Sequence, residues 1–303
     1  MSKLFSEFAA VSSQQWKDKL CTDLKGKTFE NLISSEGTLP FYHYDTHKHF
    51  NPLPITESWE SVQWIDGSEP KKGNQQALEA LQNGMTALCI SNPQDLKTLL
   101  QDVLIQHIRI DFENYSKESI QEFEDLVEER GLNPEDILGA FHGQENKGIL
   151  PNYVYHTVFV DDIYQAIEEG QLSSQYVFNV GSNYFKEIAK MRAFLIAFEE
   201  INYTIPFILA QTSLTNKESE QPYNNLLRST TESMSAIFGG CDALMIRPYN
   251  QSFEEVNDFS NRLARNQHHI LREESFLEKV QDPSAGSYFI EALTQGFLKS
   301  ERQ

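Results

Sequence analysis

Amide, imidazole and carboxylate side chains stand in or near several short apolar runs that resemble strands. Gln211 ends one run, His156 lies within another, and Asn250 and Glu254 follow the last run at a spacing of four. Amide and imidazole groups in such places can hydrogen-bond a carbonyl oxygen or a ribose hydroxyl. Because the same residue types often cap loops, both a ligand-binding and a structural interpretation are open at this point.

The elements that would position these groups alternate along the chain from Trp59 onward. Strand-like runs are separated by segments with helical periodicity, for example residues 75–83, 93–103, 117–131 and 183–201. Eight strand candidates can be counted: 61–64, 86–91, 107–112, 137–141, 153–160, 176–180, 206–211 and 242–246. This alternation is typical of a parallel sheet, and eight such units close a barrel.

We therefore predict an α/β fold, a (β/α)8 TIM barrel, with functional groups at the carboxyl ends of its strands. An open, doubly wound sheet is the alternative. A dinucleotide-binding version of that sheet has no support, because no Gly-x-Gly-x-x-Gly turn follows any early strand.

Residues 1–57 have a different pattern, which predicts an N-terminal arm, partly helical and partly extended, before a barrel over residues 58–303. An imperfect apolar stripe over residues 4–20 indicates a helix. Residues 35–58 contain three prolines, too many breakers for a helix. Three histidines and an aspartate there would share one side of an extended segment and could bind zinc or nickel; a solvated polar face is the simpler interpretation, so we predict no metal site. They are His43, Asp45, His47 and His49.

Composition excludes some classes of partner. The net charge of −19, from 44 acidic and 25 basic residues, argues against binding nucleic acid. No segment approaches the roughly 20 apolar residues that span a bilayer, and the N-terminus does not resemble a signal peptide. Three widely spaced cysteines predict reduced thiols and a cytoplasmic protein.

Five sequence blocks carry a resemblance to the methylmalonyl-CoA mutase family, in the order found there. They are "FNVGSNYFKEIAKMRAF" (178–194), "AQTS…QPYNNLLR" (210–228), "NNLLRSTTESMSAIFGG" (224–240), "DFSNRLARNQHHILREES" (258–275) and "DPSAGSYFIEALT" (282–294). The first half matches more weakly, through residues 59–64 and 74–88. The resemblance implies a (β/α)8 barrel that holds acyl-CoA along its centre, followed by a separate cobalamin-binding domain. It also implies an isomerase family that interconverts methylmalonyl-CoA and succinyl-CoA with adenosylcobalamin.

The resemblance also implies roles for individual residues. Gln211 matches a substrate-facing Gln and His156 a residue that meets the thioester, so both are candidate catalytic residues. Asn250 and Glu254 match positions that contact the adenosyl ribose, so both are candidate cofactor-binding residues. The last block, residues 282–294, we expect to be architectural rather than catalytic.

Other positions depart from the pattern of active members. Trp64 stands where they have the Tyr that drives cofactor homolysis, and Val62 stands where they have an Arg that meets CoA. An Arg for the acyl carboxylate and the cobalamin-binding Asp-x-His-x-x-Gly are both missing. In this family such losses mark the small subunit of the heterodimeric enzyme. The implied role is a non-catalytic partner of the large subunit, which would carry the adenosylcobalamin; this chain alone would be inactive and hold no cofactor.

Two alternatives stay open. The chain could instead be a catalytic acyl-CoA mutase barrel whose cobalamin domain lies in a removed segment or in another chain. The isolated chain could also self-associate, and acyl-CoA remains a candidate ligand. Because the sequence stops at "FLKSERQ" without a capping glycine, we expect a fragment of a longer protein.

Overall fold

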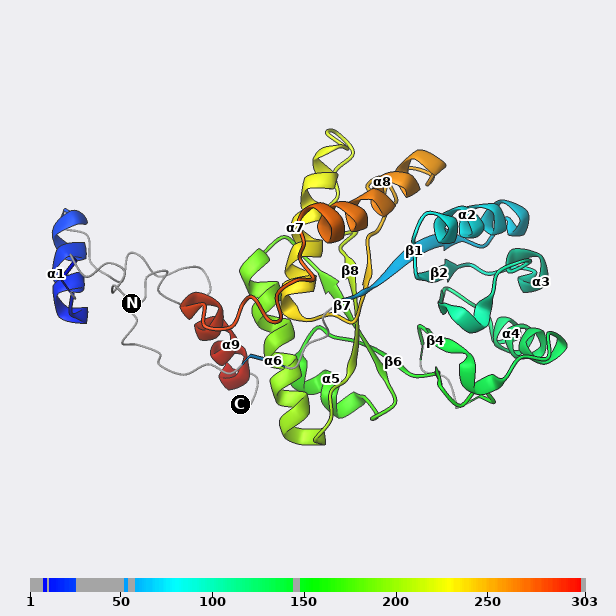
Figure 1. Cartoon of the computed structure of the whole chain (residues 1–303), viewed down its shortest axis with the longest axis horizontal. Helices are drawn as coiled ribbons and strands as arrows, with labels where there is room; N and C mark the ends of the chain where they lie inside the picture. Colours follow the sequence, from blue (N-terminus) through cyan, green and yellow to red (C-terminus); the bar gives the residue numbers. More distant parts are fainter. Residues whose placement is uncertain (1–7, 10, 26–51, 54–57, 144–147, 301–303) are drawn as a thin grey trace, which may run out of the picture.

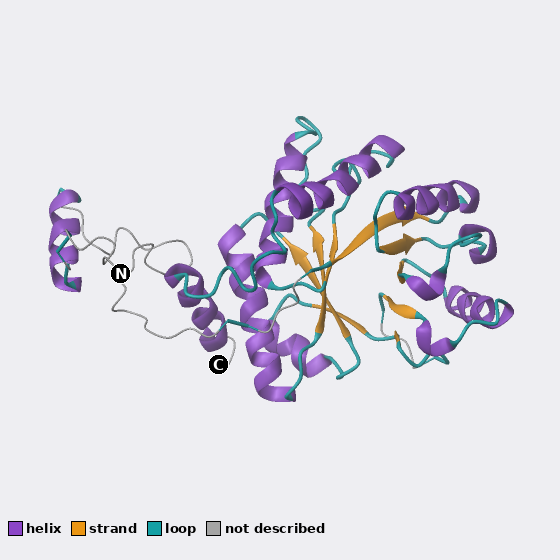
Figure 2. Ribbon diagram, in the orientation of Figure 1, coloured by secondary structure: helices purple, strands orange, loops and turns teal. Residues whose placement is uncertain are grey.

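A ring of parallel strands surrounded by helices forms the centre of the molecule (Figures 1 and 2). The computed structural model describes residues 8–9, 11–25, 52–53, 58–143 and 148–300. The predicted α/β barrel is confirmed, and its strands all pair in parallel in the order β5-β4-β3-β2-β1-β9-β8-β7-β6. Their bounds are β1 Glu60–Asp66, β2 Ala87–Ser91, β3 Arg109–Glu113, β4 Leu138–Phe141, β5 Tyr153–Val154, β6 Thr157–Phe159, β7 Gln175–Val180, β8 Phe207–Thr212 and β9 Ala243–Met245.

The nine strand pieces correspond to eight predicted strands, because the fifth is divided in two. β5 pairs with β4, β6 pairs with β7, and only Tyr155 and His156 lie between β5 and β6. The amide of Thr157 donates to the carbonyl of Gly143 at 2.8 Å, just beyond β4. The broken strand therefore joins the two ends of the sheet, and the ring closes through the chain itself.

Helices cover the outside of the ring, as expected for βα units. Their bounds are α2 Pro70–Gln82, α3 Leu96–Leu99, α4 Lys117–Glu129, α5 Ile163–Glu169, α6 Tyr184–Asn202, α7 Asn224–Gly239, α8 Asp258–His269 and α9 Tyr288–Ser300. α4 begins with a capping box at Ser116, and α7 ends before Gly240, whose φ of 93° a residue with a Cβ rarely adopts.

One predicted helix is shorter than its sequence pattern suggested. The pattern over residues 93–103 indicated about three turns, but α3 has four residues. Asp95, the N-cap, has a φ of 40°, and the C-cap Leu100 has a φ of −102° and a ψ of 14°. Since helical residues need negative φ, the left-handed Asp95 prevents the helix from beginning earlier, and a second left-handed residue, Asp102 with a φ of 60°, lies three residues beyond its end.

Apolar side chains pack on both faces of the sheet. Two clusters fill the space between strands and helices, one around Phe178 and Phe194 and the other around Phe112 and Phe141. A third cluster contains Cys89 from β2 together with Val177 from β7. These two strands lie on different sides of the ring, so the third cluster occupies the inside of the barrel, as in other filled (β/α)8 cores.

The block "DPSAGSYFIEALT" is held to the outside of α6 by a buried ion-pair network. Arg192 of α6 pairs with Asp282 and, at 3.0 Å, with Glu291. Asp282 also accepts a hydrogen bond from the amide of Leu53 at 2.8 Å. Gly286, at a φ of 78°, turns the chain so that its own amide donates to Glu291 at 3.1 Å. All these contacts are structural.

Little of the predicted N-terminal arm falls within the described residues. α1 (Ser13–Asp23) begins with a capping box formed by Ser12 and Gln15, and none of its residues is buried. The histidine-rich segment with His43, Asp45, His47 and His49 lies outside the described residues. Within the described ranges, no helix has the length and apolar character needed to span a membrane.

Replacing Arg192 should destabilise the fold strongly. The change Arg192→Met leaves two carboxylates buried without their cation, which costs about 3–5 kcal/mol for a buried pair. Urea unfolding at pH 7 measures this loss. Lys97→Met removes an exposed partner of Glu129 and should leave the midpoint unchanged. Equal midpoints for Arg192→Met and the wild type would show that the network does not hold the block in place.

Candidate functional site

Strand β3 carries a charged face toward the inside of the barrel. In "RIDFE", Ile110 and Phe112 pack against the outer helices. Arg109, Asp111 and Glu113 alternate with them and therefore point to the ring interior, because successive strand residues face opposite sides. Three charged side chains of one strand thus enter a space that many barrels fill with apolar residues.

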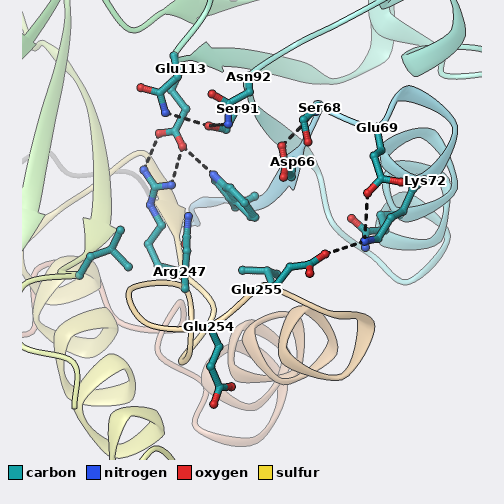
Figure 3. Close-up of a pocket in the computed structure, with 16 residues that line it drawn as sticks. Asp66, Ser68, Glu69, Lys72, Ser91, Asn92, Glu113, Arg247, Glu254 and Glu255 are labelled. Atoms are coloured by element: carbon teal, nitrogen blue, oxygen red, sulfur yellow. Dashed lines mark hydrogen bonds and ion pairs between the residues drawn. The ribbon is translucent and has the colours of Figure 1, made fainter. Parts of the chain in front are cut away.

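At the mouth of the barrel, Glu113 forms a bidentate ion pair with Arg247, which follows β9 (Figure 3). Nη1 and Nη2 of Arg247 donate to Oε1 and Oε2 of Glu113 at 2.8 and 2.6 Å. The indole nitrogen of Trp64, on β1, donates to the same carboxylate at 2.6 Å. This arrangement joins three strand ends around one carboxylate and fixes its position.

Gln211 extends this group to the neighbouring strands. Its Oε1 accepts a hydrogen bond from Nη2 of Arg247 at 2.6 Å, and its Nε2 donates to Asn179 of β7 at 2.5 Å. Gln211 is 6% exposed. We call Trp64, Glu113, Arg247 and Gln211 the mouth cluster. Hydrogen bonds and the ion pair connect these four side chains across the mouth of the barrel.

The pKa values of the ion pair follow from its surroundings. Burial raises the pKa of Glu113, but the hydrogen bonds and positive charge of Arg247 outweigh burial and lower this pKa to about 2. Burial lowers the pKa of Arg247, but the hydrogen bonds that Arg247 donates to Glu113 and the negative charge of that carboxylate outweigh burial and raise this pKa. Both side chains are therefore charged at neutral pH.

A second polar layer lies deeper in the barrel and connects opposite strands. The Oδ2 atom of Asp111 lies 3.1 Å from Nε2 of His142 and accepts a hydrogen bond from Gln175 of β7 at 3.0 Å. Arg109 pairs with Asp111 at 2.9 Å and stacks 4.2 Å above the ring of Phe207 on β8. Together with the apolar cluster around Val177, these contacts fill the axis of the ring with side chains.

Above the mouth cluster lies a cavity of about 440 Å³ (Figure 3). Trp64, Glu113 and Arg247 belong to its lining. The rest of the lining is rich in acidic groups, which are Asp66, Glu69, Glu254 and Glu255, and also includes Lys72. Lys72 contacts Glu255 at 3.3 Å and Glu69 at 3.8 Å, so the rim keeps an excess of negative charge.

Of the other three predicted site residues, Asn250 and Glu254 contact each other, and His156 lies elsewhere. Glu254 is exposed and lines the cavity. Asn250 is fully buried, and its Nδ2 donates to the carbonyl of Glu255 at 3.3 Å and to Oε2 of Glu254 at 3.5 Å. His156 lies between β5 and β6, where Nδ1 is 2.8 Å from the hydroxyl of Ser174. Gln211 and Glu254 are thus close to the mouth, Asn250 lies beneath the surface, and His156 does not line the cavity.

The central residue of the site, Glu113, was not identified from the sequence. It follows the predicted strand 107–112 at its carboxyl end, where barrel enzymes place functional groups. The available signal was the alternation of charged and apolar residues in "RIDFE", which marks one charged face of a strand. Its pairing with Arg247 joins residues separated by 134 positions, and a single sequence carries no signal for that contact.

Comparison with known proteins shows which family the chain resembles. A family model described as Methylmalonyl-CoA mutase matches residues 166–303. The methylmalonyl-CoA mutase small subunit of Porphyromonas gingivalis is 29% identical over an alignment 381 residues long. The alignment covers 96% of this chain and 62% of that protein. The resemblance of the chain to the methylmalonyl-CoA mutase family is thus confirmed. It spans 62% of the length of that small subunit and a smaller share of the other relatives below.

Other relatives in the methylmalonyl-CoA mutase family align with the second half of the chain. The mutase of Rhizobium meliloti is 37% identical over 134 residues, covering 41% of this chain and 18% of that protein. The human mitochondrial methylmalonyl-CoA mutase is 36% identical over 138 residues, covering 42% of this chain and 18% of that protein. The resemblance inferred from residues 178–294 is confirmed by these matches. Glu113 and His142 lie outside the segment matched by the family model.

Glu113 should make stability depend on pH in the acid range. Its pKa in the folded protein is below the ordinary value of 4.5, so its contribution is present above pH 4.5 and is lost as the pH falls toward 2. The whole contribution is about 3 kcal/mol by linkage. Urea unfolding of the wild type and Glu113→Gln between pH 7 and 2.5 tests this. The stability gap between the two proteins should shrink below pH 4.5, and a constant gap would contradict the assigned ion pair.

Proposed function

We propose that this chain is a small subunit of an adenosylcobalamin-dependent methylmalonyl-CoA mutase and that it is a non-catalytic partner. In this proposal a large subunit binds acyl-CoA and interconverts methylmalonyl-CoA and succinyl-CoA. The observation that carries the proposal is the filled barrel axis. Trp64, Glu113, Arg247 and Gln211 occupy the mouth of the ring, where the family resemblance implies an acyl-CoA.

The mouth cluster would oppose entry of an acyl-CoA on energetic grounds. A substrate along the axis must displace Arg247 from Glu113, two side chains that are 7% and 14% exposed. Separating a buried pair in this way costs about 3–5 kcal/mol, which would have to come from substrate binding. The acidic groups on the rim, among them Asp66 and Glu255, would also repel the phosphates of CoA.

The residues present do not fit the cofactor. A ribose contact from Asn250 would need an accessible amide, but Asn250 is fully buried and its amide donates to the backbone of Glu255. Glu254, although exposed, belongs to an acidic rim on which no described histidine lies. We therefore assign adenosylcobalamin to the large subunit and assign no cofactor-binding role to Asn250 or Glu254 in this chain.

His156 and Gln211 are then retained from a catalytic ancestor without a catalytic task. Gln211 is engaged by Arg247 and Asn179, and the imidazole of His156 is engaged by Ser174. The contact of each side chain is one that a structural residue would make. A cytoplasmic location belongs to the same proposal, and Cys21, Cys89 and Cys241 support it because all three are free thiols.

Co-purification tests the partnership. The natural full-length protein, tagged in its own host, should bring down a cobalamin-binding mutase subunit in a fixed ratio. Methylmalonyl-CoA mutase activity should follow the complex and be absent from the isolated small subunit. Mutase activity in the isolated protein would rule out the proposed role and favour a catalytic barrel.

Substitutions in the reconstituted complex test whether this chain takes part in the chemistry. His156→Ala and Gln211→Ala should each leave kcat within about twofold of the wild type, because the reaction takes place in the partner. His107→Ala, an exposed imidazole, is the control. If these residues act on substrate, kcat should instead fall by about 100-fold or more, and steady-state kinetics on complexes of verified stoichiometry distinguishes the two results.

A further inference from the structure

Three side chains with metal-ligand chemistry meet inside the barrel on adjacent strands. They are Cys89 of β2, Glu113 of β3 and His142, which directly follows β4. The Cys89 sulfur, a carboxylate oxygen of Glu113 and a ring nitrogen of His142 all lie within 4.8 Å of one another. Ligand atoms around a tetrahedral metal are about 3–4 Å apart, given bond lengths of about 2.0–2.3 Å. The three groups are therefore close to the spacing that one ion requires.

The backbone holds these three groups in fixed register. Cys89 stands opposite Asp111 in the β2–β3 pairing, and Ser91 stands opposite Glu113. The amide of His142 donates to the carbonyl of Phe112 at 2.8 Å, which continues the β3–β4 ladder by one residue. Sites built on strands keep their geometry better than sites built on loops. The cluster is thus a property of the barrel wall.

The imidazole of His142 is oriented by a carboxylate. Its Nε2 lies 3.1 Å from Asp111, and the side chains of His142 and Asp111 are 2% and 1% exposed. Nε2 also lies 3.2 Å from the side-chain amide nitrogen of Gln175, so both polar contacts of the ring found among the described residues involve Nε2. A carboxylate on one ring nitrogen is the usual arrangement for a histidine whose other nitrogen binds a metal, because it fixes the tautomer and the ring direction.

We propose that Cys89, Glu113 and His142 form a binding site for one divalent metal ion of the zinc class. Thiolate, imidazole and carboxylate together suit zinc, whereas magnesium and calcium prefer oxygen ligands alone. Glu113 also lines the mouth cavity, which gives an ion a path from solvent and leaves room for water as a fourth ligand. The sequence predicted no metal site here, because the three residues are far apart along the chain.

The charges around the cluster accommodate such an ion. With Cys89 as a thiolate, the anions near the site are this sulfur and the carboxylates of Asp111 and Glu113. The cations are Arg109 and Arg247, which pair with these carboxylates. Three negative and two positive charges leave a net negative charge, which favours a bound cation. The nearby guanidinium groups therefore do not exclude the metal.

Metal binding must release a proton. Burial raises the pKa of the Cys89 thiol well above its ordinary value, so the metal-free site holds a neutral S–H group. On binding, the sulfur–hydrogen bond is replaced by a sulfur–metal bond and the proton goes to solvent. Affinity should consequently fall about tenfold for each unit that the pH decreases, since thiolate ligation is coupled to one proton.

Cobalt(II) is the probe for this site, because a cobalt–thiolate bond gives a near-ultraviolet charge-transfer absorption. Titration of the full chain under anaerobic conditions at pH 7.5 should give one equivalent of bound cobalt with that absorption. Zinc should then displace the cobalt and remove the signal. A protein that binds no cobalt, or binds it without the charge-transfer band, would overturn the proposal.

Matched variants locate the ion. Cys89→Ala should abolish the charge-transfer band, whereas Cys241→Ala, which removes another buried thiol, should leave the band and affinity unchanged. His142→Gln should weaken zinc binding by more than about 100-fold, and Asp111→Asn by about 10–100-fold through loss of the orienting carboxylate. Circular dichroism checks folding, and Cys89→Ser serves if Cys89→Ala is unstable.

The histidines of the N-terminal segment are the rival ligands. Replacing His43, His47 and His49 by alanine together should leave the thiolate signal and one equivalent of tightly bound metal. If the triple variant bound no metal while Cys89→Ala bound metal as the wild type does, the ion would belong to the N-terminal segment. That result would contradict a site in the barrel.

Discussion

The ion pair between Glu113 and Arg247 joins opposite parts of the ring, and the arrangement of the mouth depends on it. Glu113 comes from β3 and Arg247 follows β9, and the carboxylate also accepts the indole hydrogen of Trp64. A buried charge without its partner is unfavourable by several kcal/mol. Each of the two side chains therefore fixes the other, and together they close the axis of the barrel.

The same pair connects the two proposals for this chain. By satisfying Arg247, Glu113 removes the free cation that could otherwise meet a substrate carboxylate at the mouth. By pointing inward beside Cys89 and His142, the same carboxylate completes a ligand set for a metal ion. If the axis holds no acyl-CoA, as proposed, charged side chains can occupy it, since the interior must be filled in some other way.

The fold was predictable because the strand and helix periods are strong and local. All eight strand runs were found, and the division of the fifth at Tyr155 and His156 was the main feature missed. The predicted length of the helix at α3 was wrong, because the pattern of apolar residues gives no information on the positive φ of Asp95. Family blocks in the second half gave the resemblance, and the match to residues 166–303 confirms it.

The site was less predictable than the fold. The resemblance implied a substrate-facing role for Gln211 and cofactor contacts for Asn250 and Glu254, and these roles stay predictions. In the structure Gln211 and Glu254 lie near the mouth and Asn250 is fully buried. The contacts that define the interior, such as Glu113 with Arg247 and Asp111 with Gln175, join positions far apart in the sequence. A single sequence does not show which distant residues contact one another in the folded barrel. The polar interior therefore became visible only once the strands were in register.

The occupied axis is the central claim, and direct binding of acyl-CoA tests it most simply. Isothermal titration of succinyl-CoA into the isolated, folded chain should give no binding stronger than about 1 mM, which corresponds to about −4 kcal/mol. Saturable binding of one succinyl-CoA per chain with a micromolar Kd would mean that the mouth cluster opens, and would contradict the account.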